Sequence, residues 1–452
     1  MIADLRVMNY YPATGGWNKM WTDWQPSVID RNFAEIHALG ANAVRIIVFP
    51  ATFGWPTVSS IMATRFADAL AIAAANGLGV QLTLFDRWAS YDEVTQSQQW
   101  LQSLLQLYSA DPEIRLVELK NEVDPSDLRQ VAWLKALLPS LRSVLPTTPI
   151  TVSVTGTDAP SEFVQLRSEL DGAPLDVADM HFYGDERSAY SWMLKAKQAA
   201  GSLPLFVGEI GYPVDAGPGG LAAAEMSQAH WFDVVFAAAR AADVPVPAPW
   251  TFTDFEPGAI PGRTESTEQY HFGLYATSGR PRPVVSVVRN AYMGKGSDTS
   301  NLNFELEGKD GLPMVWSTYL PSQGALGYAP KAGYVDPGSV RLSGTRLTSL
   351  GAPAFYLVPA TPAISGQLWT VGVWAKGIDV NGNALVALSW YNSNGSYLGE
   401  NSTSLPYGNT GWTRLVVSAR VPSGATGVQI NLQANNVSGT VWFNAVSILV
   451  GS

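Results

Sequence analysis

The sequence predicts a chain of the α/β class, a (β/α)8 TIM barrel followed by an all-β jelly-roll sandwich domain. Apolar strand runs alternate with helical patterns through residues 1–293, and the eight repeats fill a length of about 290 residues, typical of such a barrel. After residue 300, short alternating runs separated by Gly, Asn, Ser and Pro predict the sandwich. A doubly wound open sheet is the alternative to the barrel, but that fold usually has about five or six strands.

The strand runs are mostly continuous and apolar, as expected for parallel strands buried on both faces. The first helix is the best marked, because Pro26 opens it, Ile29, Phe33 and Ile36 share one face, and Gly40 ends it. The predicted strands span about 5–10, 42–49, 80–85, 114–120, 150–155, 175–182, 204–209 and 246–252. The further helices span about 59–76, 93–108, 126–138, 160–170, 188–200 and 221–242.

The small and polar segment 294–300 is typical of a linker. We therefore predict a barrel domain at 1–293, a linker at 294–300 and a β-sandwich at 301–452. The charge is uneven between them: residues 301–452 hold 7 Lys+Arg and 6 Asp+Glu, so the excess negative charge lies in the first 300 residues.

The composition excludes several classes of function. The chain has no cysteine, which excludes disulfides, thiolate nucleophiles and cysteine metal sites. Its four histidines, at positions 37, 181, 230 and 271, show no metal-ligand spacing. A net charge of −10 argues against nucleic acid as a partner. No apolar run approaches the roughly 20 residues that cross a bilayer, so we expect no membrane span.

The first residues enter a strand almost at once, and no signal peptide is visible. We expect a secreted or extracellular monomer whose signal peptide is not part of this sequence. A cytoplasmic protein would look the same.

Two strand runs end in a carboxylate. Asn121 and Glu122 close the fourth run, and Glu209 closes the seventh. In a parallel barrel the carboxyl ends of the strands meet on one face, where catalytic groups lie. Two carboxylates brought together there can split a glycosidic bond, one as proton donor and the other as nucleophile.

Other strand ends add polar and aromatic side chains to the same face. These candidates for substrate binding are Asn9, Arg45, Asp86, His181, Tyr183 and Trp250. Carboxylates, amides, an imidazole and aromatics together have the chemistry of a sugar site. The Gly-rich stretch 215–220 lacks the Lys and Ser/Thr of a phosphate-binding loop, and we interpret it as a flexible loop.

With these residues in place, the first 293 residues resemble the clan A retaining glycoside hydrolases, and among them the cellulase-like family 5. Members of that clan have an Asn-Glu pair at the end of strand four and a second Glu at the end of strand seven, which match Asn121, Glu122 and Glu209. The resemblance extends to Arg45 and to the "HFY" and "PWTF" runs that contain His181, Tyr183 and Trp250. It does not extend to strand three. That strand ends in Phe85-Asp86-Arg87 where family 5 often has a His, which leaves the subfamily and substrate open.

The resemblance implies roles for these residues. Glu209 is expected to be the nucleophile, held by Arg45 and Tyr183. Glu122 is expected to act as acid and then base, with a pKa raised by the neighbouring carboxylate.

The remaining candidates are assigned to the substrate. Asn121 is expected to bind the sugar 2-hydroxyl, His181 to orient Glu122 or a hydroxyl, and Trp250 to form the floor under the ring. Asn9 and Asp86 are expected to contact substrate. No cofactor or metal is expected.

Each of these residues also has a structural alternative. Glu122 could cap the helix that begins near Ser126, and Glu209 could be a satisfied buried carboxylate. Arg45 could form a structural ion pair, and His181, Tyr183 and Trp250 could belong to the core. Asn9 and Asp86 could be strand-end structure.

The sandwich resembles carbohydrate-binding modules of the jelly-roll type. The likeness rests on Asn303-Phe-Glu305 and Met314-Val-Trp316 at its start and on residues 439–446 at its end. Exposed aromatics such as Tyr391 or Tyr397 could bind sugar, but a purely structural domain is equally compatible, and we assign no site there.

The sequence therefore predicts a retaining glycoside hydrolase that cleaves a β-linked polysaccharide or oligosaccharide, with an endo-β-glucanase or mannanase as the first interpretation. The alternatives are an exo-acting β-glycosidase, a non-catalytic polysaccharide-binding barrel, and a barrel enzyme that acts on a phosphorylated metabolite.

Overall fold

The computed structural model describes residues 2–215, 220–294, 301–302, 304, 311–313, 315–335, 338–358 and 360–451. The chain divides into two compact units, one of residues 1–215 with 224–297 and one of residues 298–452 with the short segment 216–223. Most of the predicted linker and of the Gly-rich stretch lies outside the described residues.

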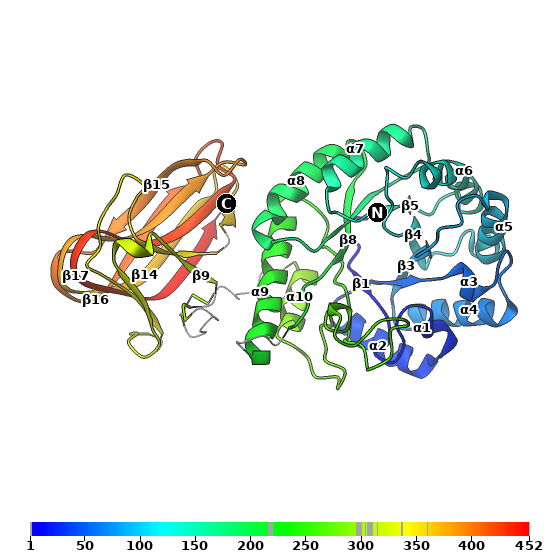
Figure 1. Ribbon diagram of the computed structural model, residues 1–452, viewed down its shortest axis with the longest axis horizontal. Coiled ribbons are helices and arrows are strands. Elements are labelled where there is room, and N and C mark those ends of the chain that lie inside the picture. Colours follow the sequence, from blue (N-terminus) through cyan, green and yellow to red (C-terminus); the bar gives the residue numbers. More distant parts are fainter. Residues whose placement is uncertain are drawn as a thin grey trace. The chain divides into compact units, whose positions relative to one another are not determined.

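The first unit is built on parallel strands surrounded by helices (Figure 1). Its strands are β1 (Val7–Asn9), β2 (Ala43–Ile47), β3 (Gly79–Phe85), β4 (Ile114–Lys120), β5 (Ile150–Thr151), β6 (Ser153–Val154), β7 (Ala178–Phe182) and β8 (Leu205–Ile210). Strands β1 to β5 form one parallel sheet and β6 to β8 another, in chain order. Only Val152 separates β5 from β6, so together they occupy the position of the predicted fifth strand.

The predicted last strand at 246–252 is not a regular strand, but it closes the barrel. Ala248 N donates to Val207 O and Trp250 N to Ile210 O on the side of β8, and Asn9 N donates to Pro249 O on the side of β1. The segment carries proline at 245, 247 and 249. These prolines lack the N–H groups that would face β1, so only part of the ladder can form.

Among the described residues, seven of the ten helices match sequence patterns, whereas the helices at 19–22, 50–53 and 284–292 were not predicted. The helices are α1 (Lys19–Thr22), α2 (Pro26–Ala38), α3 (Pro50–Phe53), α4 (Ser60–Ala75), α5 (Val94–Leu105), α6 (Leu128–Val144), α7 (Ala159–Glu169), α8 (Ala189–Ala200), α9 (Gly220–Ala241) and α10 (Val284–Tyr292), with 3₁₀ turns η1 (Gln106–Tyr108), η2 (Glu186–Ser188) and η3 (Glu268–Tyr270). Helix α2 has Pro26 in its first turn, and its buried face consists of Ile29, Phe33 and Ile36, as predicted. The Ser59 side chain accepts a hydrogen bond from Met62 N and so caps α4.

The core of this unit lies between the helices and the barrel. Strands β2, β3 and β8 are buried along their whole length, which explains their apolar sequences. Four tryptophans, Trp21, Trp100, Trp133 and Trp231, are among the largest fully buried side chains. Part of the aromatic content of the chain therefore serves packing rather than ligand binding. Among the described residues, no helix is both long and apolar enough to cross a membrane.

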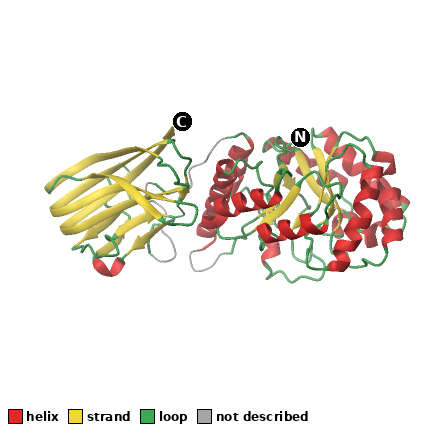
Figure 2. Cartoon of the chain, turned by 90° about the horizontal axis from the view of Figure 1, so that it is seen from above, coloured by secondary structure: helices red, strands yellow, loops and turns green. Residues whose placement is uncertain are grey.

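The second unit is all β, as predicted (Figure 2). Its elements are β9 (Trp316–Tyr319), η4 (Pro321–Gln323), β10 (Ala325–Ala329), β11 (Ser339–Ser343), β12 (Ala354–Leu357), β13 (Thr361–Pro362), β14 (Leu368–Tyr391), β15 (Tyr397–Ser404), β16 (Gly408–Arg420) and β17 (Gly427–Gly451). Their pairings are antiparallel and join the nine strands into one sheet.

The jelly-roll prediction was too specific, because this sheet curves into a nearly closed barrel. The runs 368–374 and 384–390 were predicted as separate strands, but both belong to β14, and 427–432 and 439–443 both belong to β17. Register shifts near Gly377 and between Ile378 and Asn383 allow β14 to bend while it stays paired. The motif residues Asn303, Glu305 and Met314 lie outside the described residues.

Helix α6 offers a matched test of the core. Leu134 is 0% exposed, whereas Leu128 at the start of the same helix is 67% exposed. Leu134→Ala should lower the free energy of unfolding by about 2–5 kcal/mol, because it leaves a cavity against the barrel. Leu128→Ala should change it by less than about 0.5 kcal/mol. Urea denaturation followed by circular dichroism measures both, and equal losses would contradict the placement of α6.

Candidate active site

The carboxyl ends of β4 and β8 bring Glu122 and Glu209 together. Asn121 still belongs to the ladder, since its N–H donates to Phe85 O, but Glu122 leaves the strand with φ of +50°. This left-handed conformation is costly for a residue with a side chain, and such residues cluster at functional sites. The Glu122 N–H donates to Ser153 Oγ at 2.9 Å, which fixes the turn.

Glu209 lies near the end of β8 and is only 5% exposed. Its Oε1 accepts a hydrogen bond from Arg45 Nη1 at 2.5 Å, and its Oε2 accepts one from the Tyr183 hydroxyl at 2.6 Å. Both oxygens are therefore held in fixed positions. The Tyr183 ring keeps 41% of its surface exposed while its hydroxyl reaches the carboxylate.

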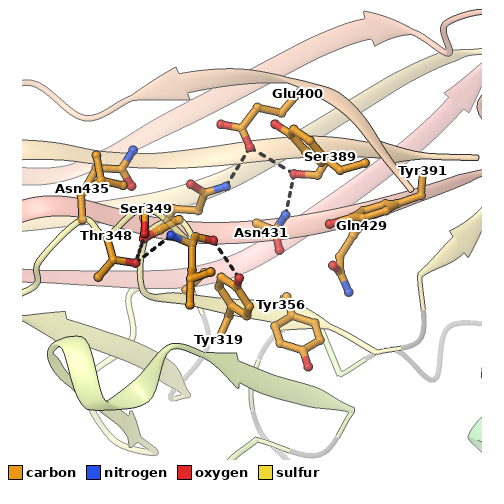
Figure 3. Close-up of a pocket in the computed structure, with 17 residues that line it drawn as sticks. Tyr319, Thr348, Ser349, Tyr356, Ser389, Tyr391, Glu400, Gln429, Asn431 and Asn435 are labelled. Carbon is orange, nitrogen blue, oxygen red and sulfur yellow. Dashed lines mark hydrogen bonds between the residues drawn. The ribbon is translucent and has the colours of Figure 1, made fainter. Parts of the chain in front are cut away.

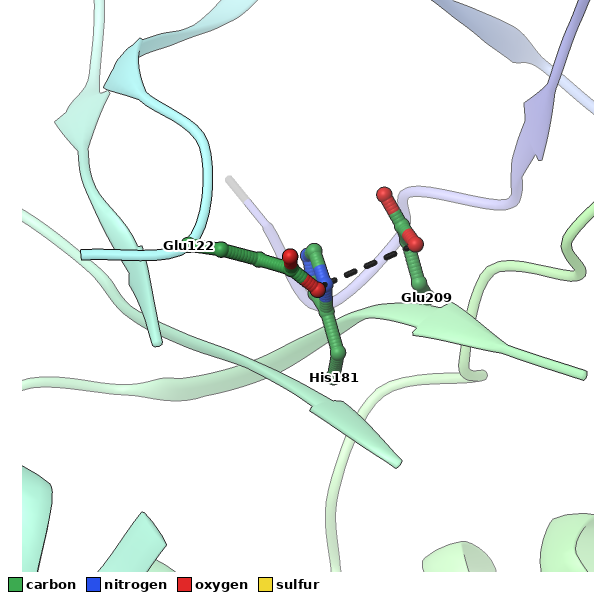
Figure 4. A group of neighbouring side chains, drawn as sticks. All are labelled: Glu122, His181 and Glu209. Atoms are coloured by element: carbon green, nitrogen blue, oxygen red, sulfur yellow. Dashed lines mark hydrogen bonds and ion pairs between the residues drawn. The ribbon is translucent and has the colours of Figure 1, made fainter. Parts of the chain in front are cut away.

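His181 lies between the two glutamates (Figure 4). Its Nδ1 is 3.0 Å from Glu122 Oε1 and 3.5 Å from Glu209 Oε2. One oxygen of each glutamate and a ring nitrogen of His181 all lie within 4.8 Å of one another. This spacing is compatible with a retaining pair, whose carboxyls are about 5–5.5 Å apart.

The contact between His181 and Glu122 shifts the pKa values of both groups. Burial lowers the pKa of His181, but the charge of Glu209 and the hydrogen bond to Glu122 outweigh it and raise that pKa to about 9. Burial raises the pKa of Glu122, but the hydrogen bond and charge of His181 bring it below its usual value. The expectation of a raised Glu122 pKa is therefore wrong, because the hydrogen bond and positive charge of His181 favour the ionised form of Glu122.

Arg45 connects the site to the barrel interior. It is 1% exposed, and its Nη2 donates to Glu118 Oε2 and to Asn121 Oδ1, both at 2.7 Å, while its Nη1 donates to Asn9 Oδ1 at 2.9 Å. Burial alone would lower the pKa of Arg45, but the charges of Glu118 and Glu209 raise it above the usual value. Its charge is thus balanced by two carboxylates.

Glu118 and Asp179 form a second carboxyl pair below the site, and the sequence analysis missed both. Each is 0% exposed. Burial raises the pKa of Asp179 well above its usual value, and the charge of Glu118 adds to this effect. Burial also acts to raise the pKa of Glu118, but the charges of Arg45 and His181 outweigh burial and bring that pKa below its usual value. These shifts favour the protonated form of Asp179 and the ionised form of Glu118. The sequence did offer a signal for both, because each is an acidic residue within a mostly apolar strand run.

A cavity of about 720 Å³ opens above these groups. Of the predicted residues, six line it: Asp86, Asn121, Glu122, Tyr183, Glu209 and Trp250. The other three, Asn9, Arg45 and His181, lie below it, 1%, 1% and 0% exposed, and contact its lining residues or one another. Their positions fit support of the site better than direct contact with substrate.

Both the oxygen and the nitrogen of the Asn121 side-chain amide form hydrogen bonds. Its Oδ1 accepts from Arg45 at 2.7 Å, and its Nδ2 donates to Asp86 Oδ1 at 3.1 Å. The amide nitrogen has a second N–H, which is available to a ligand in the cavity. Burial raises the pKa of Asp86, although nearby Lys120 and Asn121 oppose this.

Aromatic rings form one wall of the cavity. The Trp17 and Trp250 rings meet edge to face with centroids 6.5 Å apart, and the Arg87 guanidinium lies 4.9 Å above the Trp17 ring. Trp17 and Arg87 each have φ of +51°, like Glu122 in the left-handed region. Tyr212, Arg263 and Phe272 also line the cavity and were not predicted.

The structure argues against one structural alternative. Helix α6 is capped by Asp127, whose side chain accepts from Arg129 N and Gln130 N at 3.0 and 3.4 Å. Glu122 is therefore not needed as a cap, and its side chain is 42% exposed to the cavity.

Glu122, His181 and Glu209 are also the group of described residues whose donor atoms could surround a metal ion. The donor set is poorly suited to one, since both oxygens of Glu209 already accept hydrogen bonds and the Arg45 guanidinium would repel a cation.

No protein-family model and no curated protein sequence matches the chain. Solved structures do. An exo-β-1,4-mannosidase from an Opitutaceae bacterium aligns with a TM-score of 0.55 and 17% identity over 64% of this chain and 59% of its own. A GH5_18 enzyme from Streptomyces cattleya, in complex with Manβ1-4GlcNAc, aligns with a TM-score of 0.53 and 17% identity over 64% of this chain and 80% of its own. A GH2 β-galacturonidase from Eisenbergiella tayi aligns with a TM-score of 0.51 and 15% identity over 65% of this chain and 52% of its own.

The chain thus spans less than two thirds of the mannosidase and of the galacturonidase. At these identities the likeness concerns the fold. It confirms the resemblance inferred from the strand-end residues: the N-terminal unit has the (β/α)8 fold of the clan A glycoside hydrolases, and several of its structural matches belong to family 5.

Proposed function

We propose that the protein is a retaining, exo-acting β-glycosidase, with a β-mannoside as the first candidate substrate. The observation that carries the proposal is the Glu122–His181–Glu209 group, in which carboxylate oxygens from two strand ends lie within 4.8 Å in one cavity. Retaining hydrolysis needs such a pair and no cofactor.

In the first step, Glu209 is the nucleophile. One of its oxygens attacks the anomeric carbon, a bond forms between them, and the bond from that carbon to the leaving oxygen breaks. Glu122 delivers a proton to the leaving oxygen. Arg45 and Tyr183 hold Glu209 so that the attacking oxygen needs little reorientation.

The proton for this step comes from the Glu122–His181 pair. The imidazole holds it in the free protein, 3.0 Å from Glu122 Oε1. A bound sugar would exclude water, which disfavours separated charges and moves the proton onto Glu122. The glycosidic oxygen then takes it from the carboxyl group.

In the second step, Glu122 is the base. It removes a proton from water, and the water oxygen attacks the anomeric carbon and displaces Glu209. The sum is the hydrolysis of one glycosidic bond with retained configuration. The second N–H of the Asn121 amide is placed to donate to a sugar hydroxyl, a contact that strengthens in the transition state.

The exo-acting interpretation replaces the endo-β-glucanase or mannanase that the sequence first suggested. It is supported by the names of the matched structures, which include an exo-β-1,4-mannosidase and GH5_18 enzymes bound to Manβ1-4GlcNAc. We retain as proposals that the substrate is an oligosaccharide, that the barrel is the catalytic unit, and that the protein is a secreted monomer.

Glu209→Gln should abolish hydrolysis while the fold is kept. Because the amide cannot attack the anomeric carbon, kcat on 4-nitrophenyl β-mannoside should fall by about a thousandfold or more. The matched control is Glu268→Gln, which alters an exposed carboxylate on the same cavity and should retain most activity. If wild type releases no nitrophenol from the β-mannoside, β-glucoside, β-galactoside or β-xyloside, and binds sugar as the variant does, the barrel is a non-catalytic binding protein.

The pH profile should report the shared proton. In wild type kcat/KM should fall as the pH rises through about 9, because His181 then loses the proton that Glu122 must deliver. In His181→Asn only Glu122 can hold the proton, with an ordinary carboxyl pKa, so the alkaline limb should move down by several pH units. A variant with an unchanged limb near pH 9 would show that another group supplies the proton.

The buried carboxyls allow a matched comparison. Glu118→Gln removes an anion from Arg45 and should lower kcat by roughly 10–100-fold, because Arg45 then no longer holds Glu209 and Asn121 in place. Asp179→Asn should be nearly neutral, since Asp179 is already uncharged and the amide oxygen can still accept from Gly208 N. Kinetics and thermal denaturation of both variants test this, and the reverse order of the losses would refute the assigned protonation.

A further inference from the structure

The β unit carries its own groove on one face of the sheet (Figure 3). Five neighbouring strands, β15, β14, β17, β12 and β9, form its floor, and the segment 347–352 forms a wall. Its volume is about 660 Å³, close to that of the cavity in the barrel. Tyr391 and Tyr397, the aromatics that the sequence suggested as possible sugar contacts, both line the groove.

A row of amide side chains runs along the middle of the groove. Strand β17 alternates apolar residues that are buried with polar residues that line the groove. The buried set is Val428, Ile430, Leu432 and Ala434, and the groove set is Gln429, Asn431, Gln433 and Asn435. Six residue steps of a strand span about 20 Å, so the row is long enough for an extended ligand.

The backbone of β17 is not available to a ligand. The strand pairs with β14 through Ser389 and Gln429, and with β12 through Tyr356 and Asn431. Strand β14 therefore occupies one edge of β17 along the whole row, and β12 occupies the other edge from Asn431 to Gln433. A peptide that binds by adding a strand needs a free edge, which argues against that partner on this face.

Tyrosine rings flank the amide row. Tyr319 on β9 is 44% exposed, and Tyr397 on β15 is 56% exposed. The Tyr391 and Tyr397 rings meet edge to face with centroids 5.9 Å apart. Exposed rings on both sides of a polar row offer flat apolar surfaces to a ligand that also needs hydrogen bonds.

The polar groups in the groove are partly preorganised. Glu400 Oε2 accepts from Ser389 Oγ at 3.1 Å and from Gln433 Nε2 at 3.0 Å, and Asn431 Nδ2 donates to Ser389 Oγ at 2.7 Å. Asn435 Oδ1 is buried and finds no hydrogen-bond partner among the described residues. Glu400 is the one charged residue among those that line the groove.

We propose that this groove binds an extended, uncharged glycan of several sugar units. Each amide offers donors and an acceptor, which match hydroxyl groups that both donate and accept. The tyrosine faces suit the C–H faces of sugar rings. The groove has no Lys or Arg, which disfavours phosphates and nucleic acids, and its carboxylate disfavours acidic polymers. The inference does not depend on hydrolysis by the barrel.

Affinity electrophoresis of the full-length chain tests the proposal. The Glu209→Gln background prevents turnover, and the gels contain glucomannan, xylan or mixed-linkage β-glucan, with polygalacturonate as the anionic comparison. At least one neutral polymer should retard the protein. Tyr397→Ala and Tyr319→Ala should each weaken that retardation at least tenfold, and so should Gln429→Glu, which places a second carboxylate at a half-buried position in the groove.

The control is Tyr407→Ala, which removes a tyrosine that is 64% exposed on the same unit and outside the groove, and should change nothing. Thermal denaturation checks that each variant is folded. The proposal fails if no neutral polymer retards the protein, if only polygalacturonate does, or if the folded groove variants behave like Tyr407→Ala. It also fails if retardation is lost in Trp250→Ala alone, since the barrel would then be the binding site.

This experiment separates the two proposals. Tyr397→Ala in the otherwise unaltered chain should leave hydrolysis of the small nitrophenyl glycoside unchanged, because that substrate does not reach the groove. If the barrel proves inactive but a neutral glycan still retards the protein in a Tyr397-dependent way, the groove proposal stands alone.

Discussion

The buried charge of Arg45 is the constraint on which the barrel site depends. A guanidinium that is 1% exposed must have its charge balanced and its N–H groups bonded. Here it meets Glu118, Glu209, Asn121 and Asn9, which come from three other strands. Arg45 therefore holds Glu209 and the Asn121 amide in fixed positions relative to Glu118 in the barrel interior.

The same electrostatics explain where the proton is. The charge of Arg45 is already balanced by Glu118 and Glu209. The second carboxylate at the cavity, Glu122, therefore pairs with His181. The protonated form of Asp179 is favoured because its burial and the charge of Glu118 outweigh the opposing charges of His181 and Arg45. Alternate charged and neutral groups thus allow several carboxyls to lie in one barrel without mutual repulsion.

The two units use polar groups in different ways. The barrel concentrates buried charges below its cavity, which suits bond cleavage. The β unit presents neutral amides and tyrosines along a groove on its sheet, which suits the capture of an extended ligand. Each proposal can be tested without the other.

Much of this could be predicted from the sequence, because it depends on local pattern. Apolar runs and helix signals located the barrel strands and helices, and the strand ends pointed to Glu122 and Glu209. The prolines at 245, 247 and 249 were a local signal against a regular last strand that the strand prediction passed over. Local pattern could not show that 368–391 would form one bent strand, or that Glu118 and Asp179 point inward. It also missed the amide row, visible as alternation in 429–435 but meaningful only once β14 and β12 lie beside it. Strand ends and periodicity are properties of the chain, whereas proton positions and grooves arise from distances between segments, which only the tertiary structure sets.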